Sequence, residues 1–173
     1  NFLKVASSVK ALQKIAAFHR KQFDIPVIGI TGSNGKTIIK EWLYQLLSKD
    51  YSIVKNPGSY NSQIGVPLSV WQMQGHHQLG IFEAGISQPA EMDALREVMQ
   101  PTIGIFTNIG TAHDEGFKTH QQKIKEKCKL FEHTKVVIAC SDCADVVATL
   151  RRQDRPLLVW GKDGDIQVSY SGS

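Results

Sequence analysis

The chain has 173 residues, of which 42% are hydrophobic, 8% aromatic and 21% charged, so we expect one folded domain rather than a disordered or fibrous chain. Lys and Arg exceed Asp and Glu by 20 to 16, and this net charge of +4 suits an anionic ligand without a face that is typical of a nucleic-acid partner. No apolar run approaches the roughly 20 residues that cross a bilayer, so we expect no membrane span.

The first predicted element is an amphipathic helix near the N-terminus. Its apolar residues follow helical spacing: Val9, Leu12, Ala16 and the neighbouring Ile15. We expect residues 1–24 to be a linker helix at the end of a preceding region, and residues 25–173 to form the main domain, incomplete at its C-terminal end.

A strand, a loop and a second helix follow. The apolar run at 25–30 predicts a buried strand, and a polar, glycine-rich stretch fills 31–35. We expect a helix over 36–49, with one apolar face made of Ile39, Trp42, Leu43 and Leu46.

The same alternation continues to the end of the chain. Further strands are predicted at 52–55, 79–82, 103–106, 136–139, 157–160 and 166–170. Helices are predicted at 89–100, 120–131 and 144–152, with another that Pro67 would open. This order predicts an α/β fold in which helices flank a mostly parallel sheet.

The strongest motif lies between the first strand and the second helix. Glycines there let backbone amides turn toward a phosphate group, and the helix N-terminus adds a positive dipole. Lys36 supplies a charge, and Thr37 can reach a Mg²⁺ ion. The usual G-x-x-x-x-G-K-[ST] pattern is not met, because Ile30 stands where it needs a glycine. We predict a phosphate loop with a displaced first glycine, formed by Thr31, Gly32, Ser33, Asn34, Gly35, Lys36 and Thr37.

Ligands in an open parallel sheet gather at the carboxyl ends of the strands. Glu83 follows the strand at 79–82, where its carboxylate could bind the Mg²⁺ that accompanies phosphates. The strand at 103–106 leads toward His113. Taken alone, Glu83 is typical of a solvated loop and His113 of a surface or capping residue, so both assignments depend on the phosphate loop.

Lys127 lies inside an apolar helical stripe. Ile124, Cys128 and Phe131 are spaced to share one helix face, and Lys127 falls in the middle of that face. Its side chain could extend to solvent, or burial could lower its pKa and free a neutral amine for chemistry. The other lysines of this helix, Lys123, Lys125 and Lys129, are expected on a solvated face.

The three cysteines, Cys128, Cys140 and Cys143, form an odd set that favours a reducing, cytoplasmic setting. The Cys140-to-Cys143 spacing is also found in redox motifs, and with Cys128 and His133 it could supply four zinc ligands. The second pair lacks the usual zinc spacing, so small core or loop cysteines are the favoured interpretation.

Four ordered segments between about residues 5 and 160 resemble the Mur ligases. The loop at 30–37 has that family's displaced-glycine form. The other segments are Tyr60-Asn61-Ser62-Gln63-Ile64-Gly65-Val66-Pro67-Leu68, Glu83-Ala84-Gly85 and Asn108-Ile109-Gly110-Thr111-Ala112-His113-Asp114-Glu115-Gly116-Phe117. Lys127 also matches the position at which the family carries a carbamylated lysine.

The resemblance implies a P-loop NTPase-like central domain over residues 25–173. The branch of the family that these segments most resemble adds D-alanyl-D-alanine (D-Ala-D-Ala) to UDP-N-acetylmuramoyl-tripeptide in peptidoglycan synthesis, with ATP and two Mg²⁺ ions. Thr37 and Glu83 would hold one ion, and His113 with carbamylated Lys127 the other. Lys36, Asn61, His113 and Lys127 form the implied catalytic set. Substrate-binding domains of the same polypeptide would flank the chain, so the isolated fragment should not ligate.

Three positions depart from the family pattern. Ser62 replaces a second asparagine, Lys129 replaces a usual Glu, and Cys140 replaces a common asparagine. These departures resemble the form of the ligase that is fused to an alanine racemase in some Bacteroidetes.

Two other functions remain open. Folylpolyglutamate synthase shares the phosphate loop and the acyl-phosphate chemistry, although the segments around Tyr60 and His113 favour the cell-wall ligase. A non-catalytic nucleotide-binding module is the third interpretation, and it would leave Lys127 without a need for modification.

Overall fold

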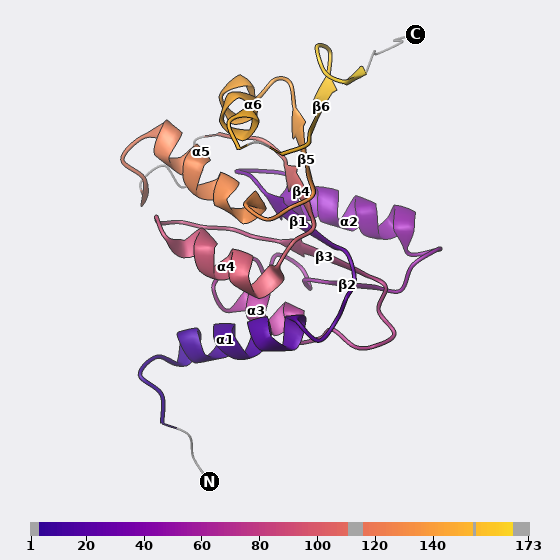
Figure 1. Cartoon of the computed structure of the whole chain (residues 1–173), viewed down its shortest axis with the longest axis vertical. Coiled ribbons are helices and arrows are strands. Elements are labelled where there is room, and N and C mark those ends of the chain that lie inside the picture. The colour runs from indigo at the N-terminus through magenta and orange to yellow at the C-terminus, as the bar shows by residue number, and fades with distance from the viewer. Residues whose placement is uncertain (1–3, 111–115, 154, 168–173) are drawn as a thin grey trace.

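The computed structural model describes residues 4–110, 116–153 and 155–167. Strands and helices alternate along these ranges (Figure 1). The strands are β1 (Val27–Thr31), β2 (Ile53–Lys55), β3 (Leu79–Glu83), β4 (Ile103–Phe106), β5 (Val136–Cys140), β6 (Leu157–Gly161) and β7 (Ile166–Gln167). All pair in parallel, in the order β2-β3-β1-β4-β5-β6-β7, so the predicted α/β class with its parallel sheet is confirmed.

The sheet register sets the position of the site. β1 and β3 are buried at every residue, as expected for central strands of a parallel sheet covered on both faces. Ile30 pairs with Glu83, and Thr31 pairs with Phe106. The carboxyl ends of β1, β3 and β4 therefore lie side by side.

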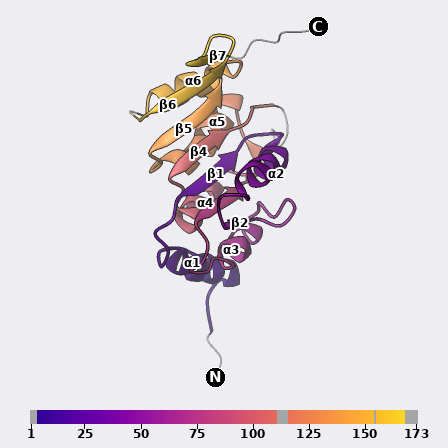
Figure 2. The same cartoon turned by 90° about the vertical axis from the view of Figure 1, so that its right-hand side faces the viewer.

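Helices cover the two faces of the sheet unequally (Figure 2). α2 (Lys36–Leu47) packs against the small apolar cluster of β1 and β3 on one face. The larger core on the other face gathers residues of α1 (Ser8–Arg20), α3 (Gly65–Val70), α4 (Glu91–Met99), α5 (His120–Cys128), the 3₁₀ turn η2 (Lys129–Phe131) and α6 (Ala144–Arg151). Among the described residues, no helix is long and apolar enough to span a bilayer.

The apolar face predicted for α2 is partly wrong. Ile39 and Leu43 pack against the sheet as expected, together with Leu47. Trp42 is 63% exposed and Leu46 is 72% exposed, so both point to solvent. The helix carries two adjacent apolar stripes, and only one of them faces the strands.

Several smaller predictions also need correction. Ile15 is 49% exposed, so it lies outside the buried side of α1. α3 begins at Gly65, which makes Pro67 its third residue rather than its first; a proline in the first turn displaces no helical hydrogen bond. The helix predicted over 120–131 ends at Cys128 and continues as the tighter turn η2. The end of the last predicted strand, 168–170, lies outside the described residues.

Candidate active site

The predicted phosphate loop joins β1 to α2 and packs against the end of β4. Gly32 and Gly35 have φ angles of 144° and 78°, which only glycine adopts without strain. A Cβ on Gly32 would overlap the Thr107 hydroxyl, so glycine is also required by close packing. The loop is held at Ser33, whose amide donates to the Asn108 carbonyl over 2.8 Å, and at Asn34, whose amide donates to Asn108 Oδ1 over 3.0 Å.

Lys36 begins α2, and its side chain folds back over the loop. Its Nζ donates to the carbonyls of Gly32 and Ser33 at 2.9 and 3.0 Å. Burial lowers the pKa of Lys36, and Lys123 lowers it further, while Glu83 acts in the opposite direction. A phosphate oxygen at the loop would offer this ammonium a stronger partner than two carbonyls.

Glu83 ends β3 and is fully buried. Its Oε1 accepts from Thr37 Oγ1 at 3.2 Å and from Asn61 Nδ2 at 3.0 Å. Its Oε2 is buried and accepts no hydrogen bond within the described part of the chain. An orphaned carboxylate oxygen beside a threonine hydroxyl fits Mg²⁺, which prefers a few protein oxygens together with phosphate oxygens.

Lys127, which the helical pattern left open between extension to solvent and burial, is buried. It is 1% exposed, and its Nζ donates to the Gly32 carbonyl at 3.2 Å, which joins α5 to the phosphate loop. Burial lowers the pKa of Lys127 to about 7, with further contributions from the charges of Lys36 and Lys123. In a substantial fraction of the molecules, Lys127 therefore carries a neutral amine at neutral pH.

Lys123 is a site residue that the sequence pattern misplaces. It is fully buried rather than on a solvated face, and its Nζ donates to the Gly110 carbonyl. Lys125, in contrast, is exposed as predicted. Because Lys36, Lys123 and Lys127 all act on one another electrostatically, the loop region concentrates positive charge suited to an anionic ligand.

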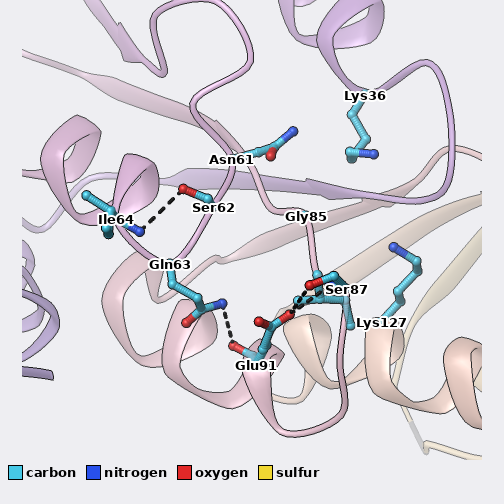
Figure 3. Close-up of a pocket in the computed structure, with 10 residues that line it drawn as sticks. Lys36, Asn61, Ser62, Gln63, Ile64, Gly85, Ser87, Glu91 and Lys127 are labelled. Atoms are coloured by element: carbon cyan, nitrogen blue, oxygen red, sulfur yellow. Dashed lines mark hydrogen bonds between the residues drawn. The ribbon is translucent and has the colours of Figure 1, made fainter. Parts of the chain in front are cut away.

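A cavity of about 320 Å³ opens beside these groups (Figure 3). Lys36 and Lys127 reach toward it from the loop side, and Asn61 lies across from them. Its remaining lining residues are Ser62, Gln63, Ile64, Gly85, Ile86, Ser87 and Glu91. The cavity could hold a substrate group next to a phosphate bound at the loop.

His113 lies outside the described residues, within 111–115. The chain enters that segment beside the phosphate loop, since Gly110 N donates to Ser33 Oγ at 3.0 Å. The structure therefore brings together Lys36, Thr37, Asn61, Glu83 and Lys127, while the role of His113 stays a prediction.

The cysteines give no support to the zinc interpretation. All three are free, and no group of three His, Cys, Asp or Glu residues suited to a metal occurs in the described ranges. Burial raises the pKa of Cys128 to about 12, and burial is also the main cause of the raised pKa of Cys140. These are features of core thiols rather than of reactive ones.

The structure shows the surroundings of the three residues that depart from the family pattern. Ser62 Oγ accepts from the amides of Ile64 and Gly65 before α3. Lys129 Nζ pairs with Glu126 at 2.8 Å and Asp93 at 3.0 Å, and these carboxylates raise its pKa. Cys140 is buried at the end of β5.

The fold and the loop together define a parallel α/β domain of the phosphate-loop type. The chain belongs to the Mur ligase family: residues 30–170 match the model of the Mur ligase middle domain.

Relatives and solved structures agree with this membership. The chain is 38% identical over 152 residues to the UDP-N-acetylmuramoyl-tripeptide–D-alanyl-D-alanine ligase of Borreliella burgdorferi, a match that covers 88% of this chain and 33% of the relative. The MurF ligase of Thermotoga maritima, solved in complex with ADP, has a TM-score of 0.87 and 32% identity over 99% of this chain and 42% of its own. MurF from Acinetobacter baumannii also has a TM-score of 0.87, with 28% identity over 95% of this chain and 38% of its own. The chain thus spans about one third of the length of the curated relative.

Proposed function

We propose that the full polypeptide carrying this chain joins D-alanyl-D-alanine to UDP-N-acetylmuramoyl-tripeptide, using ATP, in peptidoglycan synthesis. The observation that carries this proposal is the buried amine of Lys127, which reaches the Gly32 carbonyl of the phosphate loop at 3.2 Å and has its pKa lowered to about 7. The similarity to the UDP-N-acetylmuramoyl-tripeptide–D-alanyl-D-alanine ligase of Borreliella burgdorferi and to the MurF ligase of Thermotoga maritima supports the choice of reaction.

The proposed chemistry activates a carboxylate, which by itself is a poor acyl donor. An oxygen of the tripeptide's terminal carboxylate attacks the γ-phosphorus of ATP, the bond to ADP breaks, and an acyl phosphate forms. The amine of D-Ala-D-Ala then attacks the carbonyl carbon and loses a proton to solvent. Phosphate leaves with the oxygen that bridged carbon and phosphorus.

The described residues suit the first of these steps. Lys36 would exchange its two carbonyl partners for phosphate oxygens and stabilise their charge during transfer. Asn61 lines the cavity and donates to Glu83, so it can orient a substrate group beside the loop. Mg²⁺ ions, when bound, neutralise phosphate oxygens, and we propose Thr37 and Glu83 as ligands of one of them.

Lys127 and His113 are proposed as ligands of a second Mg²⁺ ion. For this role the neutral amine of Lys127 adds to carbon dioxide, an N–C bond forms, and a proton is released, which leaves a carbamate with two oxygens. Burial supports this step because it holds the side chain partly neutral near pH 7.

We also propose that residues 25–173 belong to the ATP-binding central domain and residues 1–24 to a linker from a preceding region. The alternation of strands and helices begins with β1 at Val27, after α1, which supports this division. A cytoplasmic setting is proposed from the three free cysteines and from ATP as substrate.

The test compares which carboxylate substrate triggers ADP release from the full polypeptide. With ATP and Mg²⁺, we expect ADP release to require UDP-N-acetylmuramoyl-tripeptide, and to continue over many turnovers only when D-Ala-D-Ala is also present. Release driven by a folate and glutamate would instead identify a folylpolyglutamate synthase. Nucleotide binding with no substrate-dependent release would identify a non-catalytic module.

A further inference from the structure

α2 carries a second lysine whose surroundings the phosphate loop does not explain. Lys40 lies one helical turn after Lys36 and is fully buried. Its Nζ donates to the carbonyls of Asn56, at 2.9 Å, and Gly58. Burial of an ammonium group costs folding free energy unless an opposite charge lies nearby. A carboxylate is therefore expected beside Lys40.

Glu83 is the buried carboxylate that lies near Lys40. Lys40 Nζ lies 3.9 Å from Glu83 Oε2, and both side chains have no exposed surface. Oε2 is the oxygen that accepts no hydrogen bond among the described residues. The buried ammonium and the buried carboxylate therefore face each other at a distance that is too long for a hydrogen bond but within reach of an ion pair.

Glu41 is a weaker candidate for the partner of Lys40. It lies 3.5 Å from Lys40 Nζ, but its side chain is 35% exposed. Both of its oxygens also accept from Lys55, at 2.8 and 2.7 Å, and this hydrogen bonding is the main cause of the lowered pKa of Glu41. Glu41 is thus already paired with Lys55 at the surface.

The same lysine also fixes the turn that surrounds Glu83. Asn56, whose carbonyl accepts from Lys40, receives the Glu83 amide at its Oδ1 over 2.7 Å and donates from its Nδ2 to the Tyr60 carbonyl over 2.7 Å. The next residue, Asn61, donates to Glu83 Oε1. Lys40 therefore lies near the carboxylate of Glu83 and also binds the residue, Asn56, that accepts a hydrogen bond from the Glu83 backbone amide.

We propose that Lys40 is a positioning residue that acts as the internal counter-charge of Glu83. It holds the buried carboxylate in place at the phosphate loop before a divalent cation and nucleotide bind. The pairing of Lys40 with Glu83 does not depend on which acyl substrate the enzyme takes. Only its consequence for metal binding rests on the proposed function.

A double-mutant cycle tests the pairing without nucleotide or metal. Lys40→Met, Glu83→Gln and the double variant are made in the full polypeptide, and their thermal unfolding midpoints are measured in buffer with chelator. Lys40→Met leaves a buried carboxylate unpaired, so we expect its midpoint to fall by roughly 10 °C. Glu83→Gln in the same chain removes the unpaired charge, so the double variant should regain at least half of that loss.

The matched control is Lys55→Met, which removes a lysine that pairs with α2 but does not reach Glu83. Addition of Glu83→Gln to Lys55→Met should not restore any of the unfolding midpoint that Lys55→Met loses. If Lys40→Met fails to fold, a folded double variant still supports the proposal. The proposal is overturned if Glu83→Gln alone folds and the double variant is no more stable than Lys40→Met, because Lys40 would then serve only the turn at 56–58.

A second measurement separates positioning from general damage to the fold. ADP affinity is measured with Mg²⁺ and again with chelator. Because Lys40 is proposed to orient a metal ligand, Lys40→Met should weaken binding of ADP with Mg²⁺ by roughly tenfold relative to the wild type. Binding of ADP without metal should stay within about twofold of the wild type. Equal losses under both conditions, or no loss in either, would overturn the proposed effect on the metal site. In that case the result of the double-mutant cycle would still decide the ion pair.

Discussion

Lys127 has unusual chemistry because of where α5 places it. An ordinary surface lysine is protonated at neutral pH, but this side chain is buried among cations and against the phosphate loop. The sequence pattern drew attention to this lysine because it stood within an apolar stripe, but it left two alternatives open, extension to solvent and burial. The structure shows burial, together with that of Ile124, Cys128 and Phe131.

Replacing Lys127 with Ala should abolish most ligation in the full polypeptide. Loss of a metal-binding carbamate should lower kcat/KM by at least about a hundredfold. Added formate or acetate should restore part of the activity, because a free carboxylate can occupy the place of the carbamate. Lys125→Ala, on the exposed side of the same helix, is the control and should change turnover little. Unchanged turnover in Lys127→Ala would rule out the assignment.

Carbamylation of Lys127 should depend on pH with a midpoint set by the lowered pKa of its amine. Protonation removes the nucleophile, so the carbamate should disappear as pH falls through about 7, the folded pKa of this group. With isotopically labelled bicarbonate, the NMR signal that is present in the wild type and absent from Lys127→Ala should be strong at about pH 8 and weak at about pH 6. A signal of equal size at both values would show that the amine is not the reacting group.

Other residues of the site were beyond the reach of sequence pattern. Helical spacing places Lys123 and Lys40 on a helix face, but it does not show which backbone carbonyls and carboxylates line that face. The structure supplies these partners: Gly110 for Lys123, and Asn56 with Glu83 for Lys40. The useful signal for Lys40 was its spacing of four residues from Lys36, which places both on one side of α2.

At the scale of elements, α2 shows why the helix prediction succeeded and its face prediction failed. Ile39, Leu43 and Leu47 form one stripe at helical spacing, and Ile38, Trp42 and Leu46 form the stripe beside it. Either stripe satisfies the apolar pattern of a packed helix. Only the orientation imposed by the phosphate loop turns the first stripe toward β1 and β3.

The start of α4 contains a backbone strain that a substitution should relieve. Ala90 is the N-cap of α4 and has a φ of 67°, a conformation that costs a residue with a Cβ about 1–2 kcal/mol. Ala90→Gly removes this strain but gives the unfolded chain more freedom, which offsets about 0.5–1 kcal/mol of the gain. We therefore expect its unfolding free energy to be unchanged or slightly higher.

Ala94→Gly provides the matched control, because Ala94 lies inside α4 with helical geometry. There glycine should lower the unfolding free energy by about 1 kcal/mol. Chemical denaturation of both variants checks the difference in sign. Equal losses at the two positions would contradict the claim that Ala90 is strained.

At the scale of the whole molecule, the two faces of the sheet are not equally covered. Val137 and Ala139 of β5 are fully buried in the larger core, whereas Val136 and Ile138 point to the other face and are only partly buried. α2 packs over β1 and β3 on that face rather than over β5. Parallel sheets are normally covered on both sides, so β5 marks the less covered part of this face among the described residues.

The parallel sheet was predictable because each strand is a short apolar run followed by a helix, and such units pair in parallel. The strand order was not predictable in the same way. β1 lies between β3 and β4, and this arrangement brings Thr31, Glu83 and Phe106 to one edge. Long-range pairing of this kind depends on packing across the whole sheet rather than on any local pattern.

We propose above all that the domain transfers a phosphoryl group from ATP to a substrate carboxylate. The most direct measurement uses UDP-N-acetylmuramoyl-tripeptide labelled with a heavy oxygen isotope in its terminal carboxylate, together with ATP, Mg²⁺, D-Ala-D-Ala and the full polypeptide. Mass spectrometry of the released phosphate should find one labelled oxygen for each amide bond formed, and Lys36→Ala should yield neither product. Ligation that releases only unlabelled phosphate, or ATP-driven ligation that survives in Lys36→Ala, would contradict the account.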